Sequence, residues 1–548
     1  MIGSFVRTRT ALAVGAALVA AAGCRPQVVN SPTPADAPNA AGEQTGTFVR
    51  QTPPSDPVIR RIMAEGMDSS RTEFYAQRLL DSIGPRLQGS PGSANARAWM
   101  VKMYGELGIP ARQEQYGTWA AWRRGVAHVD LITPRVRSLE STMLGWSAGT
   151  GGRPVEGEVV VLPDVQTPEQ YRAWLPSARG KFVLVSPERI TCRSDAQVAQ
   201  FATPETRASL TDQQRQSTQG WATRNVAAGG PRMQAAMKEA GVAGVMSSSW
   251  SGYPGINKIF GSWRQELPTF DIGCEDYNML FRMAQANQSP RVRVTADAES
   301  LGEQPVFNVI AEMRGSEKPD EYVMLSAHFD SWDGASGATD NGTGTLVMLE
   351  AMRILKKHYP NPKRTIIVGH WGGEEQGLNG SRAFTEDNPN VVRGLHALWN
   401  QDNGTGRVAN MSPGPFVNAR PVLARYLGEL PAEITRNITL GPVGGQATGG
   451  TDHASFMCHR APGFNLGALS WDYGNTTWHT NRDTYDKIIF DDLKNNATLT
   501  AMLAYLSSED PTMMPRDIVS PLPAGRDGRA TQWVPCAPAT RSTAQSTR

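Results

Sequence analysis

The sequence lacks a strong excess of charge of either sign. Its 548 residues carry 54 Lys and Arg against 52 Asp and Glu, a net charge of +2, and contain no long basic run. Proteins that bind nucleic acid need concentrated positive charge to neutralise phosphates, so we expect no nucleic acid partner. The length, with 40% hydrophobic residues, suggests two or more globular parts, each able to bury a core.

The sequence also lacks an apolar run long enough to be assigned to a membrane span. Residues 11–22 are apolar and follow two arginines, but a spanning helix needs about twenty such residues. The pattern predicts a signal peptide over 1–24, and Cys24 resembles the lipid attachment site of a bacterial lipoprotein, with free secretion as the alternative. We therefore predict an exported protein of the periplasm or cell surface, with a flexible tether over 25–57.

Cysteine is scarce, and no two cysteines form a CxxC pair, which argues against a zinc site built from cysteine. Once Cys24 is set aside, Cys192, Cys274, Cys458 and Cys536 remain. In an oxidising compartment these four can form two disulfides in three alternative pairings. Buried free thiols are an equally compatible interpretation.

Beyond the tether, the composition and the predicted secondary structure of the chain change. Residues 145–285 alternate short strand-like runs with loops rich in Gly, Pro and Ser, and they contain no cluster of acids and histidines. We predict that this segment is a separate, non-catalytic module inserted into an α/β domain formed by 58–144 and 286–510. A C-terminal tail rich in Pro, Ser, Thr and Arg follows over 511–548.

Polar side chains follow three of the strands predicted in the last part of the α/β domain. The first strand ends at His328, and Asp340 comes after a Gly-rich turn. The second strand leads through Gly-Gly to Glu374 and Glu375, and the third leads to Asp402. Because ligands usually bind beyond the carboxyl ends of strands in such sheets, we expect these side chains to meet.

This mixture of oxygen and imidazole donors suits zinc or a similar divalent ion, and His479 in a later polar loop adds a second imidazole. Asp340, Glu375 and Asp402 would bring three negative charges together, which is costly unless cations offset them. A pair of Zn²⁺ ions would do so, and two metals about 3.5–4 Å apart can polarise a carbonyl and activate water. Glu374 is then left to handle the proton of the attacking water.

Four segments resemble the M28 family of zinc-dependent exopeptidases: AHFDSWD, ATDNGTG, GGEEQGLNGS and WHTNRDT. The resemblance spans roughly residues 65–505, and the order of the segments is similar to the carboxypeptidase Q and glutamate carboxypeptidase branches. It implies the zinc exopeptidase fold, in which helices flank a mixed, mostly parallel central sheet. It also implies that the inserted module is a β-rich protease-associated domain.

The same resemblance implies a role for each metal-binding side chain. Asp340 would bridge two Zn²⁺ ions per chain. His328 and Asp402 would complete one metal position, and Glu375 and His479 would complete the other.

Further residues take supporting roles. Glu374 matches the general base of the family, and Asp330 matches the carboxylate that orients His328 through its second ring nitrogen. Asp333 in the same loop is interpreted as structuring that loop. Four tryptophans flank the motifs and fit either a substrate pocket or the core: Trp332, Trp371, Trp471 and Trp478.

The favoured function is therefore an exported metallo-exopeptidase acting on peptides, an aminopeptidase before a carboxypeptidase or dipeptidase. The less favoured alternatives are a catalytically dead binding module, which would have lost ligands, and a glutaminyl-cyclase-like acyltransferase, which would use one zinc. Arg382 and Arg482 are candidates to receive a substrate carboxylate, and the sequence does not rank them. The oligomeric state is left open.

Overall fold

The computed structural model describes residues 55–262, 266–525 and 528–546. The predicted signal peptide, the lipid site at Cys24 and nearly all of the tether lie outside the described residues and stay predictions. None of the helices that the structure describes is both long and apolar enough to cross a membrane.

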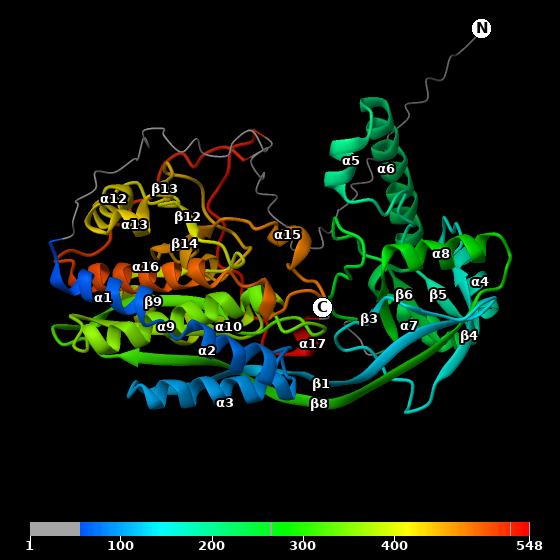
Figure 1. Ribbon diagram of the computed structural model, residues 1–548, viewed down its shortest axis with the longest axis horizontal. Coiled ribbons are helices and arrows are strands. Elements are labelled where there is room, and N and C mark those ends of the chain that lie inside the picture. Colours follow the sequence, from blue (N-terminus) through cyan, green and yellow to red (C-terminus); the bar gives the residue numbers. More distant parts are fainter. Residues whose placement is uncertain (1–54, 263–265, 526–527, 547–548) are drawn as a thin grey trace, which may run out of the picture.

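The described strands form one 14-stranded sheet. In sheet order the strands are β13 (Thr439–Leu440), β12 (Val408–Met411), β14 (Gly463–Ala468), β11 (Leu395–Asn400), β9 (Lys318–His328), β10 (Arg364–Trp371), β8 (Arg291–Met313), β4 (Val155–Val161), β5 (Phe182–Leu184), β6 (Gly244–Ser247), β7 (Thr269–Ile272) and β3 (Ser141–Met143). Off this path, β1 (Ala111–Thr133) pairs with β8, and β2 (Arg137–Leu139) pairs with β1. Figure 1 shows two lobes joined by the long pair β1 and β8.

The larger lobe, called the main body, contains the parallel strands β10, β9, β11 and β14, with β8 antiparallel to β10 and β12 antiparallel to β14. This arrangement confirms the predicted mixed, mostly parallel sheet. The register places Trp371 beside His328 and Asn400 beside Ser326. The carboxyl ends of β10, β9 and β11 therefore lie side by side.

Helices cover both faces of the main-body sheet. Successive strand side chains point to opposite faces, so Val323 and Leu325 of β9 join one apolar core while Met324 joins another. Burial on both faces explains why the strands read as continuous apolar runs. The helices of the first core include α1 (Pro57–Asp68), α2 (Thr72–Ala76) with the π-helical turns Gln77–Ile83, α3 (Pro91–Glu106), α9 (Thr343–His358), α12 (Ala419–Glu429), α13 (Ala432–Thr435) and α16 (Phe490–Glu509). Those of the second are α10 (Asn379–Asp387), α11 (Pro389–Gly394) and α14 (His453–Met457).

The smaller lobe, called the inserted lobe, begins near Ser141 and returns to the main body through β8. Its strands β4, β5, β6 and β7 are parallel and pack on a separate apolar core. Its helices are α4 (Pro168–Trp174), α5 (Asp195–Phe201), α6 (Pro204–Ala227), α7 (Met233–Ala240) and α8 (Cys274–Gln285). Because α6 alone has 24 residues, the lobe is α/β in composition, whereas the sequence predicted a β-rich module. Its assignment as a protease-associated domain stays a prediction.

The C-terminal tail packs against the main body as far as the short helix α17 (Thr543–Ser546). A disulfide joins its Cys536 to Cys458, beyond α14, and a second disulfide joins Cys192 to Cys274 within the inserted lobe. Of the two interpretations that the sequence left open, the structure has two disulfides rather than free thiols, with one of the three pairings selected. Farther along the tail, the main-chain oxygen of Arg541 accepts a hydrogen bond from the N–H of Thr118 in β1, at 2.8 Å.

Candidate metal centre

The predicted polar residues lie at the carboxyl ends of three adjacent strands. His328 is the last residue of β9. Glu374 and Glu375 follow the end of β10 after Gly372 and Gly373, and Asp402 follows the end of β11. Because β9 pairs in parallel with both neighbours, these residues emerge at one edge of the sheet, as the sequence predicted.

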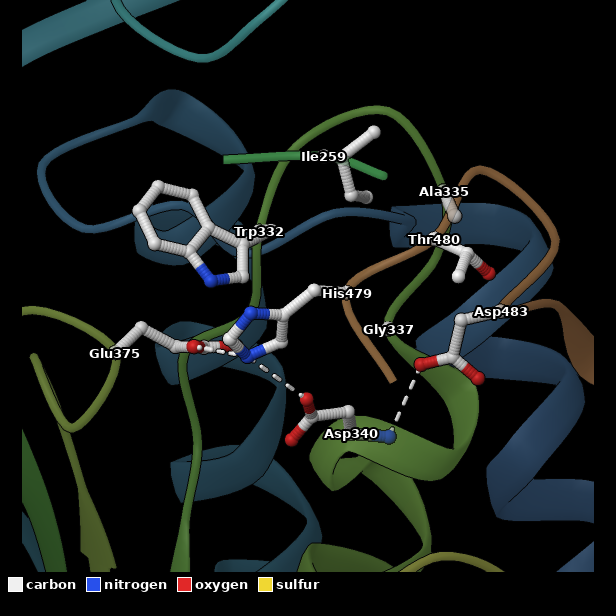
Figure 2. Close-up of a pocket in the computed structure, with 9 residues that line it drawn as sticks. All are labelled: Ile259, Trp332, Ala335, Gly337, Asp340, Glu375, His479, Thr480 and Asp483. Atoms are coloured by element: carbon white, nitrogen blue, oxygen red, sulfur yellow. Dashed lines mark hydrogen bonds and ion pairs between the residues drawn. The ribbon is translucent and has the colours of Figure 1, made fainter. Parts of the chain in front are cut away.

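Two further side chains reach this edge from elsewhere in the chain. Asp340 lies in the turn before α9, and its main-chain N–H donates to the carboxylate of Asp483 at 3.0 Å. His479 lies in the loop after α15 (Tyr473–Thr476). Figure 2 shows the ring of His479 between the carboxylates of Glu375 and Asp340.

The site consists of two groups of potential metal ligands that share Asp340. In the first group, Nε2 of His328 lies 3.3 Å from Oδ1 of Asp340 and 3.2 Å from Oδ1 of Asp402. In the second, Nε2 of His479 lies 3.3 Å from Oδ2 of Asp340 and 2.9 Å from Oε2 of Glu375. The ligand atoms of each group lie within 4.8 Å of one another. Each oxygen of Asp340 therefore faces a different group.

The electrostatics of these groups fit bound cations. Burial raises the pKa of Glu375 to about 7, and its Oε1 atom has no hydrogen-bond partner. Burial alone would lower the pKa of His479, but Glu375 and Asp340 outweigh it and raise this pKa to about 9. The carboxylates of Glu375 and Asp340 therefore stabilise a positive charge placed next to them. Carboxylate oxygen and imidazole nitrogen are the ligands that zinc accepts, so the residues present fit zinc.

The surroundings of His328 fix which nitrogen it offers. Its Nδ1 lies 3.1 Å from the main-chain oxygen of Asp330, which can only accept, so Nδ1 carries a proton and Nε2 is the nitrogen left to bind a metal. The sequence predicted that the Asp330 carboxylate would make this contact. Instead, that carboxylate lies 3.8 Å from Nδ1 and accepts the main-chain N–H groups of Glu374, at 3.1 Å, and Glu375, at 3.4 Å. Because the Asp330 carboxylate accepts two main-chain N–H groups, it orients the turn after β10. The main-chain oxygen of Asp330, rather than its carboxylate, orients the ring of His328.

Glu374 and its neighbour Glu375 face different partners. Glu375 belongs to the His479 group, whereas the charge of Glu374 interacts with His328, Asp402 and Asp452. Burial raises the pKa of Glu374, and burial raises that of Asp452 to about 7. The division of the two glutamates between metal ligand and proton acceptor stays a prediction.

Two residues that hold the site together were not predicted. Asp483 is buried and accepts hydrogen bonds from the N–H groups of Thr339, at 2.8 Å, and Asp340. Arg86 is fully buried and donates to main-chain oxygens of the loop between His328 and Asp340, including that of Gly337 at 2.8 Å. Asp483 stands in the quoted WHTNRDT segment and could have been found there, but nothing in the sequence connects Arg86 with a loop 250 residues away.

The remaining predicted residues separate into distinct roles. Asp333 pairs with Arg124 of β1, which agrees with a role in structuring the loop. Arg482 pairs with Glu140 at 3.0 Å, while Arg382 lines a cavity of about 270 Å³ between α10 and the C-terminal tail. Of the four tryptophans, Trp332 lines the site, Trp478 stacks on His479, Trp371 lies in the core, and Trp471 is 57% exposed.

Comparisons with known proteins place this geometry in context. Residues 308–504 match the model of peptidase family M28. Carboxypeptidase Q from mouse and from human are each 26% identical over 467 residues, which cover 84% of this chain and 90% and 89% of theirs. Among solved structures, an M28 peptidase precursor from Shewanella amazonensis is similar with a TM-score of 0.61 and 23% identity, covering 83% of this chain and 97% of that one. A zinc aminopeptidase from Bacillus subtilis is similar with a TM-score of 0.50 and 16% identity, covering 79% and 93%.

Proposed function

Because this chain is a zinc metallo-exopeptidase of family M28, we propose that it hydrolyses terminal peptide bonds with two zinc ions held by the candidate metal centre. His328, Asp340 and Asp402 would hold one ion, and Asp340, Glu375 and His479 the other. The observation that carries the proposal is the orientation of Asp340, whose two carboxylate oxygens face different imidazoles, at 3.3 Å each.

The residues divide the chemistry between them. Bound zinc would supply a Lewis acid and lower the pKa of a bound water toward about 7. The carboxylate of Glu374 accepts the proton of the attacking water and passes it to the leaving amine. Burial raises its pKa above that of an exposed glutamate, which makes the carboxylate a stronger base. Asp330 holds the turn that carries Glu374, so the base stays beside the reacting bond.

The excess of acids favours a substrate with a free amino terminus. Asp452 remains as an acid beyond the three proposed carboxylate ligands and the proposed base Glu374, and an ammonium group needs such an acid to receive it. Of the two arginines considered for a carboxylate, Arg482 is engaged by Glu140. An aminopeptidase is therefore the first candidate.

A carboxypeptidase or dipeptidase is the second candidate. It is favoured by the relatives named carboxypeptidase Q, which match 84% of this chain. Arg382, in the cavity beside α10, is the residue that would be tested for recognition of a carboxylate.

Export of the protein belongs to the same proposal. Two disulfides, Cys192–Cys274 and Cys458–Cys536, suit an oxidising compartment such as the periplasm or the cell surface. The signal peptide and the lipid anchor at Cys24 rest on the sequence pattern alone.

The test combines a substrate panel with one conservative substitution. The zinc-loaded protein is assayed on short peptides with free termini, with acetylated amino termini and with amidated carboxyl termini. For an aminopeptidase, we expect acetylation to abolish cleavage and amidation to be tolerated. Glu374→Gln should retain its zinc and lose about 10²–10⁴-fold in kcat, which is the usual contribution of a general base. Glu303→Gln, an exposed glutamate on β8, serves as the control. Nearly normal turnover in Glu374→Gln would refute the assignment.

A further inference from the structure

A segment of the inserted lobe, residues 253–259, pairs directly with the loop that carries His479. Lys258 forms an antiparallel bridge with Thr480, and the N–H of Ile259 donates to the main-chain oxygen of His479 at 2.8 Å. The N–H of Asn481 donates to the main-chain oxygen of Asn257 at 3.0 Å. These bonds bracket His479 on both sides, so the proposed ligand is held from the neighbouring lobe.

The side chain of Lys258 adds a second hold on the same loop. Its Nζ donates to the main-chain oxygens of Trp478, at 2.5 Å, and Gly474, at 3.0 Å, and it lies 4.6 Å from the centre of the Trp478 ring. The side chain of Trp478 in turn stacks on the ring of His479, with 3.9 Å between the ring centres. The ammonium group is buried, and burial lowers its pKa to about 8. Lys258 therefore fixes both the backbone before His479 and the aromatic ring against which His479 packs.

His479 needs such support because its backbone is strained. Its φ angle of 49° lies in the left-handed region, which residues with a side chain seldom adopt. A conformation of this kind is unfavourable and persists only where the surroundings impose it. Without its partners in segment 253–259, the loop would relax and carry the imidazole away from Glu375 and Asp340.

The other group of ligands has its supports in the main body. His328 ends β9, its Nδ1 faces the main-chain oxygen of Asp330, and its own main-chain oxygen accepts a hydrogen bond from Thr345 at 2.9 Å. Asp402 follows β11, the strand next to β9. The two metal positions therefore differ in what holds them, although they share Asp340.

We propose that Lys258 is a positioning residue, through which the inserted lobe sets the zinc affinity of the Asp340–Glu375–His479 position and leaves that of the His328–Asp340–Asp402 position unchanged. The inference rests on the two-zinc function proposed above. It gives the inserted lobe a part in building the metal centre in addition to any contact with substrate.

The test measures zinc binding without reference to turnover. The substitution Lys258→Met removes the ammonium donors and keeps an apolar stem of similar length. Zinc per chain is measured by equilibrium dialysis against buffered free zinc. For the unmodified chain we expect two ions, and for Lys258→Met one affinity unchanged and the other weakened at least about tenfold, the range found when a group supporting a metal ligand is removed. Lys238→Met is the matched control, because Lys238 lies in the same lobe and pairs instead with Glu266.

A second, milder variant keeps the test decisive if Lys258→Met fails to fold. The hydroxyl of Tyr253 donates to Asp472 at 2.7 Å, at the far end of the same segment, so Tyr253→Phe should weaken the same zinc position by a few-fold. Two unchanged affinities in a folded variant, or an equal weakening of both, would overturn the inference while the proposed function stands. An unmodified chain that binds one zinc would overturn the proposed function, and the inference with it.

Discussion

The main body contains two buried clusters of charge that are built in opposite ways. One is the metal centre at the ends of β9, β10 and β11. The other lies between α1 and α9, where Arg353 binds the carboxylates of Glu65 and Glu350, the latter at 2.8 Å. Lys357 and His358 also contact Glu65, at 2.6 and 3.3 Å.

The two clusters differ in how their negative charge is balanced. Between α1 and α9, two carboxylates meet an arginine, a lysine and a histidine. Burial would raise the pKa of Glu65, but its hydrogen bonds to Lys357 and Arg353 outweigh burial and lower this pKa to about 2. In the metal centre the balance is mixed, because burial raises the pKa of Glu375 and of Asp452 to about 7, whereas His328 and His479 outweigh burial and lower the pKa of Asp340. A buried cluster whose acids outnumber its protein cations is therefore a place where metal cations are expected.

The largest change is expected from a substitution of Asp340, which should strongly weaken zinc binding in the first cluster, the metal centre. Since this carboxylate faces both imidazoles, Asp340→Asn should weaken zinc at both positions by more than the roughly 10–100-fold lost with a supporting group, and activity should fall to background. Zinc content measured by mass spectrometry of metals after dialysis checks the result. Asp333→Asn, in the same loop but paired with Arg124, is the control and should keep both ions. An Asp340→Asn chain that retains two ions would show that the clusters do not differ in this way.

A smaller effect is expected at Glu65, on stability rather than on zinc. Glu65→Gln leaves Arg353 and Lys357 without their shared acid and should lower the free energy of unfolding by roughly 3 kcal/mol at neutral pH. Because the folded pKa of Glu65 is depressed from 4.5 to about 2, its contribution is present above the unfolded value and is lost as the pH falls toward 2.

Urea unfolding of metal-free protein checks this prediction. The difference between the unmodified chain and Glu65→Gln should shrink as the pH falls from about 5 toward 3. A difference that stays constant or grows over this range would contradict the sign of the shift. Zinc content of the variant at neutral pH should equal that of the unmodified chain.

Much of the main-body fold could be predicted because its signals are local. The strands β9, β10 and β11 are continuous apolar runs that end in glycines and acids. The helix α6 gave no such signal, since only Trp221 and Ala227 of its 24 residues are buried and no apolar stripe forms. The pairing of β1 with β8 was not predicted either, because it joins residues from 158 positions apart, at Thr133 and Arg291, to 200 apart, at Ala111 and Ala311, and many of its side chains are exposed.

The part of the candidate site made by histidine and acidic side chains could be predicted from the sequence. The contacts that position those side chains through main-chain atoms could not. Histidines and acids in Gly-rich turns identified the candidate ligands, which the structure brings together. The support of Arg86 for the loop after His328 is made through main-chain oxygens, which any sequence offers equally. The same holds for Lys258, whose partners are the main-chain oxygens of Trp478 and Gly474.

The central claim is that the excess of buried acid at the ends of three strands exists to hold two zinc ions that share Asp340. A crystal structure of the zinc-loaded protein, with anomalous difference maps recorded on both sides of the zinc absorption edge, tests it most directly. We expect two zinc peaks, one within reach of His328 and Asp402 and one within reach of Glu375 and His479, with Asp340 between them. A single peak, or zinc bound only outside these side chains, would contradict it.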